Sequence, residues 1–203
     1  MPAGKTRRRR TRSDTPRPYG LNWTRDIHNP VLQGTAGTFD AVGVSGPMVV
    51  KDGTTYHMYY TGLDATGASR IGHATSDDGF TWSKVGGVVL NVGATGEFDA
   101  FAVKLCGALI DGSTIRMWYV GTDVTGPGGR QKIGFATAAL ASPTAWTKFS
   151  GNPVLSTGAA GAFDERNLWS PWVIKDPDDG KFKMWYGGEN NGGTIRIGYA
   201  EIP

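Results

Sequence analysis

Short runs in which apolar and polar side chains alternate, separated by glycine-rich turns, recur along most of the chain. The run Gly46–Lys51 ends at an Asp-Gly turn, and the run Thr55–Thr61 after it alternates aromatic residues with small or polar ones. A third run covers Arg70–Thr75, and a short fourth run is centred on Trp82. Alternating runs joined by such turns are typical of antiparallel hairpins. The pattern predicts a unit of four antiparallel strands in an all-β protein.

This unit occurs three times, because four landmarks return in the same order at spacings of 59 to 67 residues. The landmarks are Trp23, Trp82 and Trp146; Asp40, Asp99 and Asp164, each preceded by Phe; Met58–Gly62, Met117–Gly121 and Met184–Gly188; and Arg70–Ala74, Lys132–Ala136 and Arg196–Ala200. Four-stranded units of this length, repeated around an axis, are the blades of a β-propeller. The repeats predict three blades over about 21–80, 81–144 and 145–203. The alternative, a β-solenoid, usually has shorter repeats with fewer turns.

The third unit ends after its third strand, at Glu201–Pro203, whereas a spare fourth strand precedes the first unit. Leu21–Arg25 resembles Phe80–Lys84 and Ala145–Lys148 in sequence. Three blades are fewer than the usual number of about 4–8, and open strand edges invite aggregation. We therefore expect a twofold homodimer that forms one six-bladed ring, in which each N-terminal strand completes the last blade of the partner. The alternative is a fragment of a longer ancestor whose open edges pack on a different protein.

Charge divides the chain into an arm and a body. Residues 1–20 hold seven Lys and Arg against one acid, a net charge of +6, whereas the rest of the chain carries −3. The arm has few apolar residues, so it cannot form a core of its own and is expected to be extended. Its candidate contact residues for phosphate or an acidic partner are Arg7, Arg8, Arg9, Arg10 and Arg12. We expect it to bind nucleic acid or an acidic protein, and the alternative is a solvated extension without a specific partner.

Composition excludes several classes of protein. The one cysteine, Cys106, excludes an internal disulfide framework and a cysteine zinc cluster, and the three histidines are dispersed. We expect no metal and no cofactor. No apolar run approaches the roughly 20 residues that span a bilayer, and no apolar core follows the basic N-terminus as in a secretory signal. These features predict a cytoplasmic or virion-associated protein without membrane contact.

Two motifs resemble those of known propellers. The segment Thr75–Trp82 has the form [ST]-x-D-x-G-x-T-W, which resembles the Asp-box hairpin of sialidase-type propellers, in which the Asp side chain caps the turn. From Leu21 to Pro203, the repeats of the form W…NPVL…FD…DG…MYYTG…IGxAxS resemble the glycosidase-like propeller superfamily of arabinanases, fructosidases and mannoside phosphorylases. Similar repeats occur in phage tail proteins. The resemblance implies propeller blades and a funnel that faces glycans.

The resemblance also implies where catalytic acids belong, and this sequence departs from that pattern. In the enzymes, acids one or two residues before the first-strand Pro contribute to a pair of groups that flank the glycosidic bond about 5–9.5 Å apart. Here the corresponding residues are Ser45–Pro47 and Trp169–Pro171, and Leu105–Cys106 replaces the Pro in the second repeat. The departure counts against hydrolysis by the usual residues of the family.

The candidate functional residues fall into two groups. Asp40, Asp99 and Asp164 remain candidate catalytic acids, although their presence in every repeat favours capping of a turn. The third repeat alone supplies Glu165, which could form an acid pair with Asp164. The candidate ligand-binding residues are Glu165, Arg166, Asn167, Trp169 and Trp172. The alternative is that the tryptophans fill space between blades and the guanidinium neutralises a neighbouring acid. Glu97 and Glu189 are expected to be solvated, or to rim the funnel.

These features predict a non-catalytic, glycan-facing propeller module that its basic arm tethers to a larger assembly such as a virion. One alternative is a glycoside hydrolase or phosphorylase that uses the acids named above. The other is a structural assembly protein without a ligand.

Overall fold

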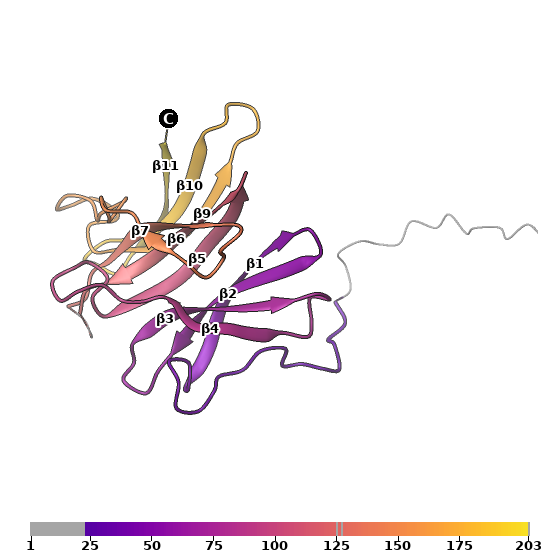
Figure 1. The fold of residues 1–203 in the computed structure, drawn as a ribbon. Helices are drawn as coiled ribbons and strands as arrows, with labels where there is room; N and C mark the ends of the chain where they lie inside the picture. The colour runs from indigo at the N-terminus through magenta and orange to yellow at the C-terminus, as the bar shows by residue number, and fades with distance from the viewer. Residues whose placement is uncertain (1–22, 125, 127, 203) are drawn as a thin grey trace, which may run out of the picture.

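The computed structural model describes residues 23–124, 126 and 128–202, so the arginine-rich arm lies outside the described residues. The described residues form eleven β-strands, and none of them belongs to a helix that could cross a membrane. Figure 1 shows the strands in three groups that follow one another from the indigo to the yellow end of the chain. The prediction of an all-β chain of repeated antiparallel units is confirmed, and the architecture is that of a partial propeller.

The first blade is a complete antiparallel unit of four strands in sequence order. It comprises β1 (Gly43–Asp52), β2 (Thr55–Leu63), β3 (Ser69–Ser76) and β4 (Ser83–Leu90). The turn between β1 and β2 has Gly53 at φ +53°, a conformation that glycine adopts without a steric penalty. The fourth strand starts just after Trp82, rather than being centred on it as the sequence pattern predicted.

The second and third blades repeat this unit with a shortened outer edge. Their strands are β5 (Ala102–Asp111), β6 (Thr114–Thr122), β7 (Gln131–Ala139), β8 (Thr147–Lys148), β9 (Asn167–Lys175), β10 (Phe182–Glu189) and β11 (Ile195–Ile202). A single parallel bridge between Gln131 and Asn167 joins β7 to β9, so the two blades form one hydrogen-bonded sheet. Among the described residues β11 pairs with β10 alone, and it is therefore an edge strand.

Two apolar clusters hold the blades face to face. The first gathers Tyr59, Val103 and Met117 between the first and second blades, and the Tyr59 ring meets Trp146 edge-on at 5.1 Å. The second gathers Trp118, Leu168 and others between the second and third blades. Tyr59 and Trp118 are both the residue after Met in the second-strand motif, so in the first two repeats the side chain at this position packs against the following blade. Burial of such rings is the main favourable contribution to blade packing.

The hairpin after β3 is capped by side chains of its own turn. Oδ1 of Asp78 accepts hydrogen bonds from the N–H groups of Phe80 (2.9 Å) and Thr81 (2.7 Å), and these backbone donors hold the pKa of Asp78 below its usual value. Oγ of Ser76 accepts one from the N–H of Gly79 at 2.8 Å. The capping carboxylate is thus Asp78, whereas the sequence pattern places its Asp at Asp77.

Candidate functional site

A cavity of about 740 Å³ opens where the first strands of the three blades converge. Ser45, Lys104 and Trp169 line it from β1, β5 and β9. Their cross-strand partners are Thr61, Val120 and Gly187, so the three residues occupy the same position in the three blades. A hydroxyl, an ammonium and an indole therefore face one space from equivalent positions. This asymmetry is what a binding site in a repeat protein requires.

The third blade gives the cavity a hydrogen-bonded group of charged and amide side chains. Nη1 of Arg166 lies 3.2 Å from Oε1 of Glu189, and Nδ2 of Asn167 donates to Oε2 of Glu189 at 2.9 Å. Oδ1 of Asn167 accepts a hydrogen bond from the backbone N–H of Gln131 at 3.0 Å. All four residues line the cavity. Arg166 thus pairs with Glu189, and not with the Asp164 or Glu165 considered from the sequence.

Trp169 and Ser170 lie at a β-bulge in the wall of the cavity. The register between β9 and β10 shifts between Trp185 and Gly187, and Ser170 has φ +43°. Such a conformation costs a residue with a Cβ of the order of 1 kcal/mol, and sites of strain cluster at functional positions. Nε1 of Trp169 and Oγ1 of Thr122 are buried and have no hydrogen-bond partner among the described residues. Both residues line the cavity, so its wall contains two unsatisfied polar atoms.

The same bulge turns Trp172 away from the cavity. Leu168 and Val173 both pack on the apolar cluster between the second and third blades, although five positions separate them. Strict alternation would place them on opposite faces, so the bulge must reverse the faces between them. Trp172 therefore lies on the outer face of the third blade, opposite Trp185, with 57% of its surface exposed.

Glu165 caps two loops beside the cavity rather than lining it. Its Oε2 accepts a hydrogen bond from the N–H of Gly161 at 2.7 Å, and its Oε1 accepts one from the N–H of Asn191 at 3.0 Å. These backbone donors stabilise the carboxylate and lower the pKa of Glu165. The structure does not bring Glu165 and Asp164 together at the cavity as an acid pair, because neither residue lines it.

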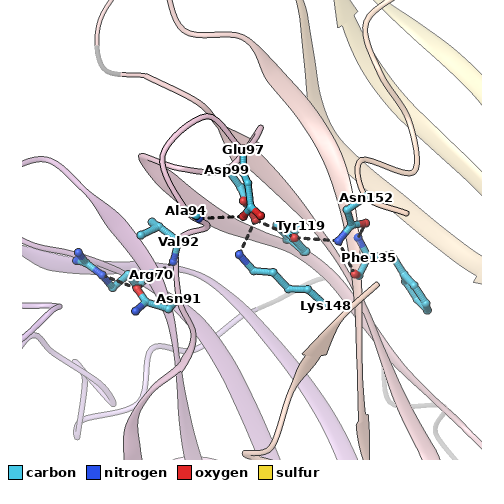
Figure 2. Close-up of polar contacts among 10 residues, drawn as sticks. All are labelled: Arg70, Asn91, Val92, Ala94, Glu97, Asp99, Tyr119, Phe135, Lys148 and Asn152. Carbon is cyan, nitrogen blue, oxygen red and sulfur yellow. Dashed lines mark hydrogen bonds and ion pairs between the residues drawn. The ribbon is translucent and has the colours of Figure 1, made fainter. Parts of the chain in front are cut away.

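The three repeated aspartates lie in the turns before the first strands, which we call the Phe-Asp turns (Phe39–Asp40, Phe98–Asp99 and Phe163–Asp164). Figure 2 shows Asp99, whose Oδ2 accepts hydrogen bonds from Oη of Tyr119 at 2.9 Å and from Nζ of Lys148 at 2.6 Å. Asn152 donates in turn to the Tyr119 hydroxyl at 3.2 Å. Burial, together with the Asp99 charge, raises the pKa of Tyr119. The phenol therefore remains a hydrogen-bond donor to Asp99.

Asp40 has the same partners in the first blade. It accepts hydrogen bonds from Tyr60 at 3.0 Å, from Lys84 at 2.5 Å and from the N–H of Thr35 at 3.0 Å. Burial alone would raise its pKa, but the Lys84 ammonium and the other donors bring the pKa of Asp40 below its usual value. None of the three aspartates Asp40, Asp99 and Asp164 lines the cavity between the first strands. Their contacts support the capping interpretation over the catalytic one.

Glu189 lines the cavity, whereas the sequence predicts either a solvated residue or one at the rim of the funnel. It ends the second-strand motif of its repeat, where the other repeats have Leu63 and Thr122. The sequence signal for Glu189 is that it carries a charge, whereas the equivalent residues of the other two repeats are uncharged. Glu97, which was considered together with it, accepts a hydrogen bond from the N–H of Ala94 at 2.9 Å instead of lining the cavity. Within the described ranges, no three His, Cys, Asp or Glu side chains gather to hold a metal ion.

Comparison with known proteins gives the fold and no finer assignment. No protein-family model matches the chain. The uncharacterized protein Rv1502 of Mycobacterium tuberculosis is 29% identical over 167 residues, which are 77% of this chain and 52% of the relative. The chain therefore spans about half the length of the curated relatives that it matches.

Solved structures with similar blades are carbohydrate-active enzymes. Zg3597, a family 117 glycoside hydrolase of Zobellia galactanivorans, is 23% identical with a TM-score of 0.64, over 78% of this chain and 51% of the enzyme. The β-1,2-mannobiose phosphorylase of Listeria innocua is 19% identical with a TM-score of 0.60, over 78% of this chain and 44% of the enzyme. At these identities the likeness establishes the fold alone: the chain is a partial propeller of the type found in glycoside hydrolases and phosphorylases.

Proposed function

We propose that the chain is a glycan-binding propeller module without catalytic activity, and that the cavity between the first strands is its binding site. The observation that carries the proposal is the group Arg166, Asn167, Trp169 and Glu189 on one wall of a cavity of about 740 Å³. An indole offers a flat apolar surface to the C–H face of a sugar, while the guanidinium, amide and carboxylate bond its hydroxyls. Ligand cavities commonly measure about 300–1,000 Å³.

The unsatisfied polar atoms in the wall support a ligand that carries hydroxyl groups. A buried polar group without a partner costs about 1–3 kcal/mol. Nε1 of Trp169 is a donor, and Oγ1 of Thr122 is both donor and acceptor. A small reorientation of either side chain toward a bound sugar hydroxyl recovers the missing hydrogen bond. Apolar ligands cannot supply this gain.

The single carboxylate of the cavity argues against catalysis. Glycoside hydrolysis usually needs two carboxyl groups, one on each side of the bond. Among the described lining residues, Glu189 is the one carboxylate, and both of its oxygens already contact Arg166 or Asn167. The other acids considered from the sequence lie in the Phe-Asp turns or, in the case of Glu165, in a capped loop. The cavity therefore has binding groups without an acid–base pair.

A glycan array probed with the full chain tests this proposal. Glycans that bind are then titrated against Trp169→Ala and Asn167→Ala, each of which we expect to weaken binding at least tenfold. Phe149→Ala is the matched control, because Phe149 is an aromatic residue that is 50% exposed and does not line the cavity. An array without hits, or affinities unchanged in Trp169→Ala, would contradict the proposal.

Aryl glycosides assayed with and without phosphate distinguish binding from catalysis. We expect no turnover under either condition. Turnover that Glu189→Gln abolishes would instead establish a glycoside hydrolase or, where phosphate is required, a phosphorylase.

A further inference from the structure

Among the described residues, the third blade lacks a cation that the other two blades have. In the first two blades, the aspartate of the Phe-Asp turn pairs with a lysine two positions after the repeat tryptophan, at 2.5 Å for Lys84 and 2.6 Å for Lys148. Asp164 is 7% exposed and accepts a hydrogen bond from the Tyr186 hydroxyl at 2.9 Å. No lysine or arginine pairs with it in the part of the chain that the structure describes. Within the described ranges, Asp164 is thus a buried carboxylate without a counter-ion.

The chain carries a spare copy of the element that supplies this cation. Trp23-Thr24-Arg25 has the pattern of Trp82-Ser83-Lys84 and of Trp146-Thr147-Lys148, with Arg25 at the position of the lysines. Trp23 is 92% exposed and Ile27 is 91% exposed, which is unusual for such large apolar side chains. By this equivalence, Arg25 is the cation that an aspartate of a Phe-Asp turn would bind.

The edge strand β11 is uncovered where its equivalents are covered. Ile197 is 75% exposed, whereas Ile71 and Ile133 at the same position are fully buried. Ile71 pairs with Leu90 in the first blade, and Ile133 exchanges hydrogen bonds of 3.0 and 3.2 Å with Leu155 in the second.

The residue equivalent to Leu155 in the spare element is Leu32, because Asn29–Leu32 and Asn152–Leu155 share the sequence Asn-Pro-Val-Leu. The missing cover of Ile197 is therefore present in the chain, as is the missing cation.

The outer face of the third blade is also uncovered. Trp185 is equivalent to Tyr59 and Trp118, whose side chains pack against the following blade. Trp185 is nevertheless 38% exposed, and its cross-strand neighbour Trp172 is 57% exposed. Tyr199 packs against Trp185 on the same face and is itself half exposed. Three neighbouring aromatic residues on a sheet face are typical of an interface with another blade.

The spare element of the same molecule does not cover this edge. Asn29–Leu32 lines one small apolar cavity together with Val44 and Met58 of the first blade. Figure 1 shows β11 at the opposite end of the row of blades from β1–β4. A twofold axis resolves the separation, because each copy then offers its first blade and spare element to the third blade of the other.

We propose that a second copy of this chain covers the open edge. Trp23–Leu32 of each copy pairs along β11 of the other, Leu32 lies opposite Ile197, and Arg25 neutralises Asp164. The contact is isologous, so both open edges are closed at once and two copies form one ring. The axial cavity is then bounded by six first strands, three from each copy.

Disulfide cross-linking tests the predicted register. Residues paired by two hydrogen bonds in an antiparallel ladder have Cα atoms about 5.5 Å apart, within the range that a disulfide bridges. In the variant Leu32→Cys/Ile197→Cys, oxidation should give a covalent dimer of about 43 kDa, twice the 21.6-kDa chain. The matched control is Ile133→Cys/Leu155→Cys, whose cysteines pair within one chain and should give a cross-linked monomer. The native chain, with Cys106 alone, gives the baseline.

Charge reversal tests the ion pair independently of the new cysteines. Sedimentation of the native chain should give the dimer mass, and Arg25→Glu should weaken the dimer at least tenfold. The double variant Arg25→Glu/Asp164→Lys should recover part of that loss, because the opposite charges meet again. A native chain that sediments as a monomer at 100 µM overturns the proposal. The proposal is also overturned if oxidation of Leu32→Cys/Ile197→Cys gives monomers, cross-linked or not, and no covalent dimer.

Discussion

Nδ1 of His57 lies 3.1 Å from Nε2 of His73 on the neighbouring strand of the first blade, and the two rings stack with their centroids 5.3 Å apart. Both side chains are buried, and Nδ1 of His73 has no hydrogen-bond partner among the described residues. At the position of His73 the other blades hold Phe135 and Tyr199. The first blade thus has a histidine where the others have Phe or Tyr, and this histidine contacts a second one.

The histidine pair makes stability depend on pH. Burial, and then the charge of His57, lowers the pKa of His73 to about 4 from its ordinary value of 6.5, and burial also lowers the pKa of His57. The unfolded chain therefore takes up protons before the folded chain as the pH falls. We expect the free energy of unfolding to be fully retained above pH 6.5 and to decrease between about 6.5 and 4, by up to about 3 kcal/mol. Urea unfolding at pH 7 and pH 5 measures the difference.

His73→Phe is the control for this prediction, since the second blade carries Phe at the same position. The variant should lose less stability than the native chain between pH 7 and pH 5. An equal loss in both proteins would assign the pH dependence to other groups.

Removal of the cation from a Phe-Asp turn should destabilise the fold. Lys148→Met leaves Asp99, which is 1% exposed, as a buried charge without its counter-ion. We expect a loss of roughly 2 kcal/mol in the free energy of unfolding, because the lysine itself is partly solvated. Lys181→Met is the control: Lys181 and Glu201 form an exposed ion pair, which contributes about 0–1 kcal/mol. Equal effects of the two substitutions in urea unfolding would contradict the structural role of the Asp99 pair.

Two glycines of each blade have side chains packed where a Cβ would lie. A Cβ added to Gly134 would lie 2.4 Å from Cζ of Tyr119 and 2.7 Å from Cζ of Phe98. Gly134→Ala should therefore lower the free energy of unfolding by about 2 kcal/mol or more, because both rings are held by the Phe-Asp turn. Gly43→Ala, where no atom lies within 4 Å of the added Cβ, should change it by less than about 0.5 kcal/mol. Thermal unfolding of the two variants checks the contrast.

The arginine-rich arm should account for any binding of nucleic acid. We expect the full chain to bind duplex DNA of mixed sequence at low salt, and deletion of residues 1–20 to abolish this binding, because the remaining chain has a net charge of −3. If all seven basic residues contact phosphates, the logarithm of affinity falls against the logarithm of salt concentration with a slope of about −6. Undiminished binding by the truncated chain would place the contact in the blades.

The blades could be predicted from the sequence because their signals are local. Alternation within Thr55–Thr61, the Asp-Gly turn at Gly53 and the return of the same motifs each depend on a few neighbouring residues. The observed strands β1–β3 contain the predicted runs and extend them by no more than three residues at either end.

The cavity could be predicted only in part, because its geometry depends on register. Arg166, Asn167 and Trp169 were recognised from their asymmetry among the repeats, and they line the cavity. Trp172 was grouped with them, but the bulge at Ser170 reverses the faces of β9 and turns it outward. Glu189 joins the group through the pairing of β9 with β10, a contact that spacing along the chain does not encode.

Each complete blade fastens its own Phe-Asp turn with residues of that blade, as Asp40, Tyr60 and Lys84 do in the first. Duplication or deletion of a whole unit in the gene would therefore leave every other fastening intact. The number of blades can change in evolution without any change in the blade itself, provided that some chain supplies the last outer strand. One ancestral unit can therefore give rise to propellers of different sizes.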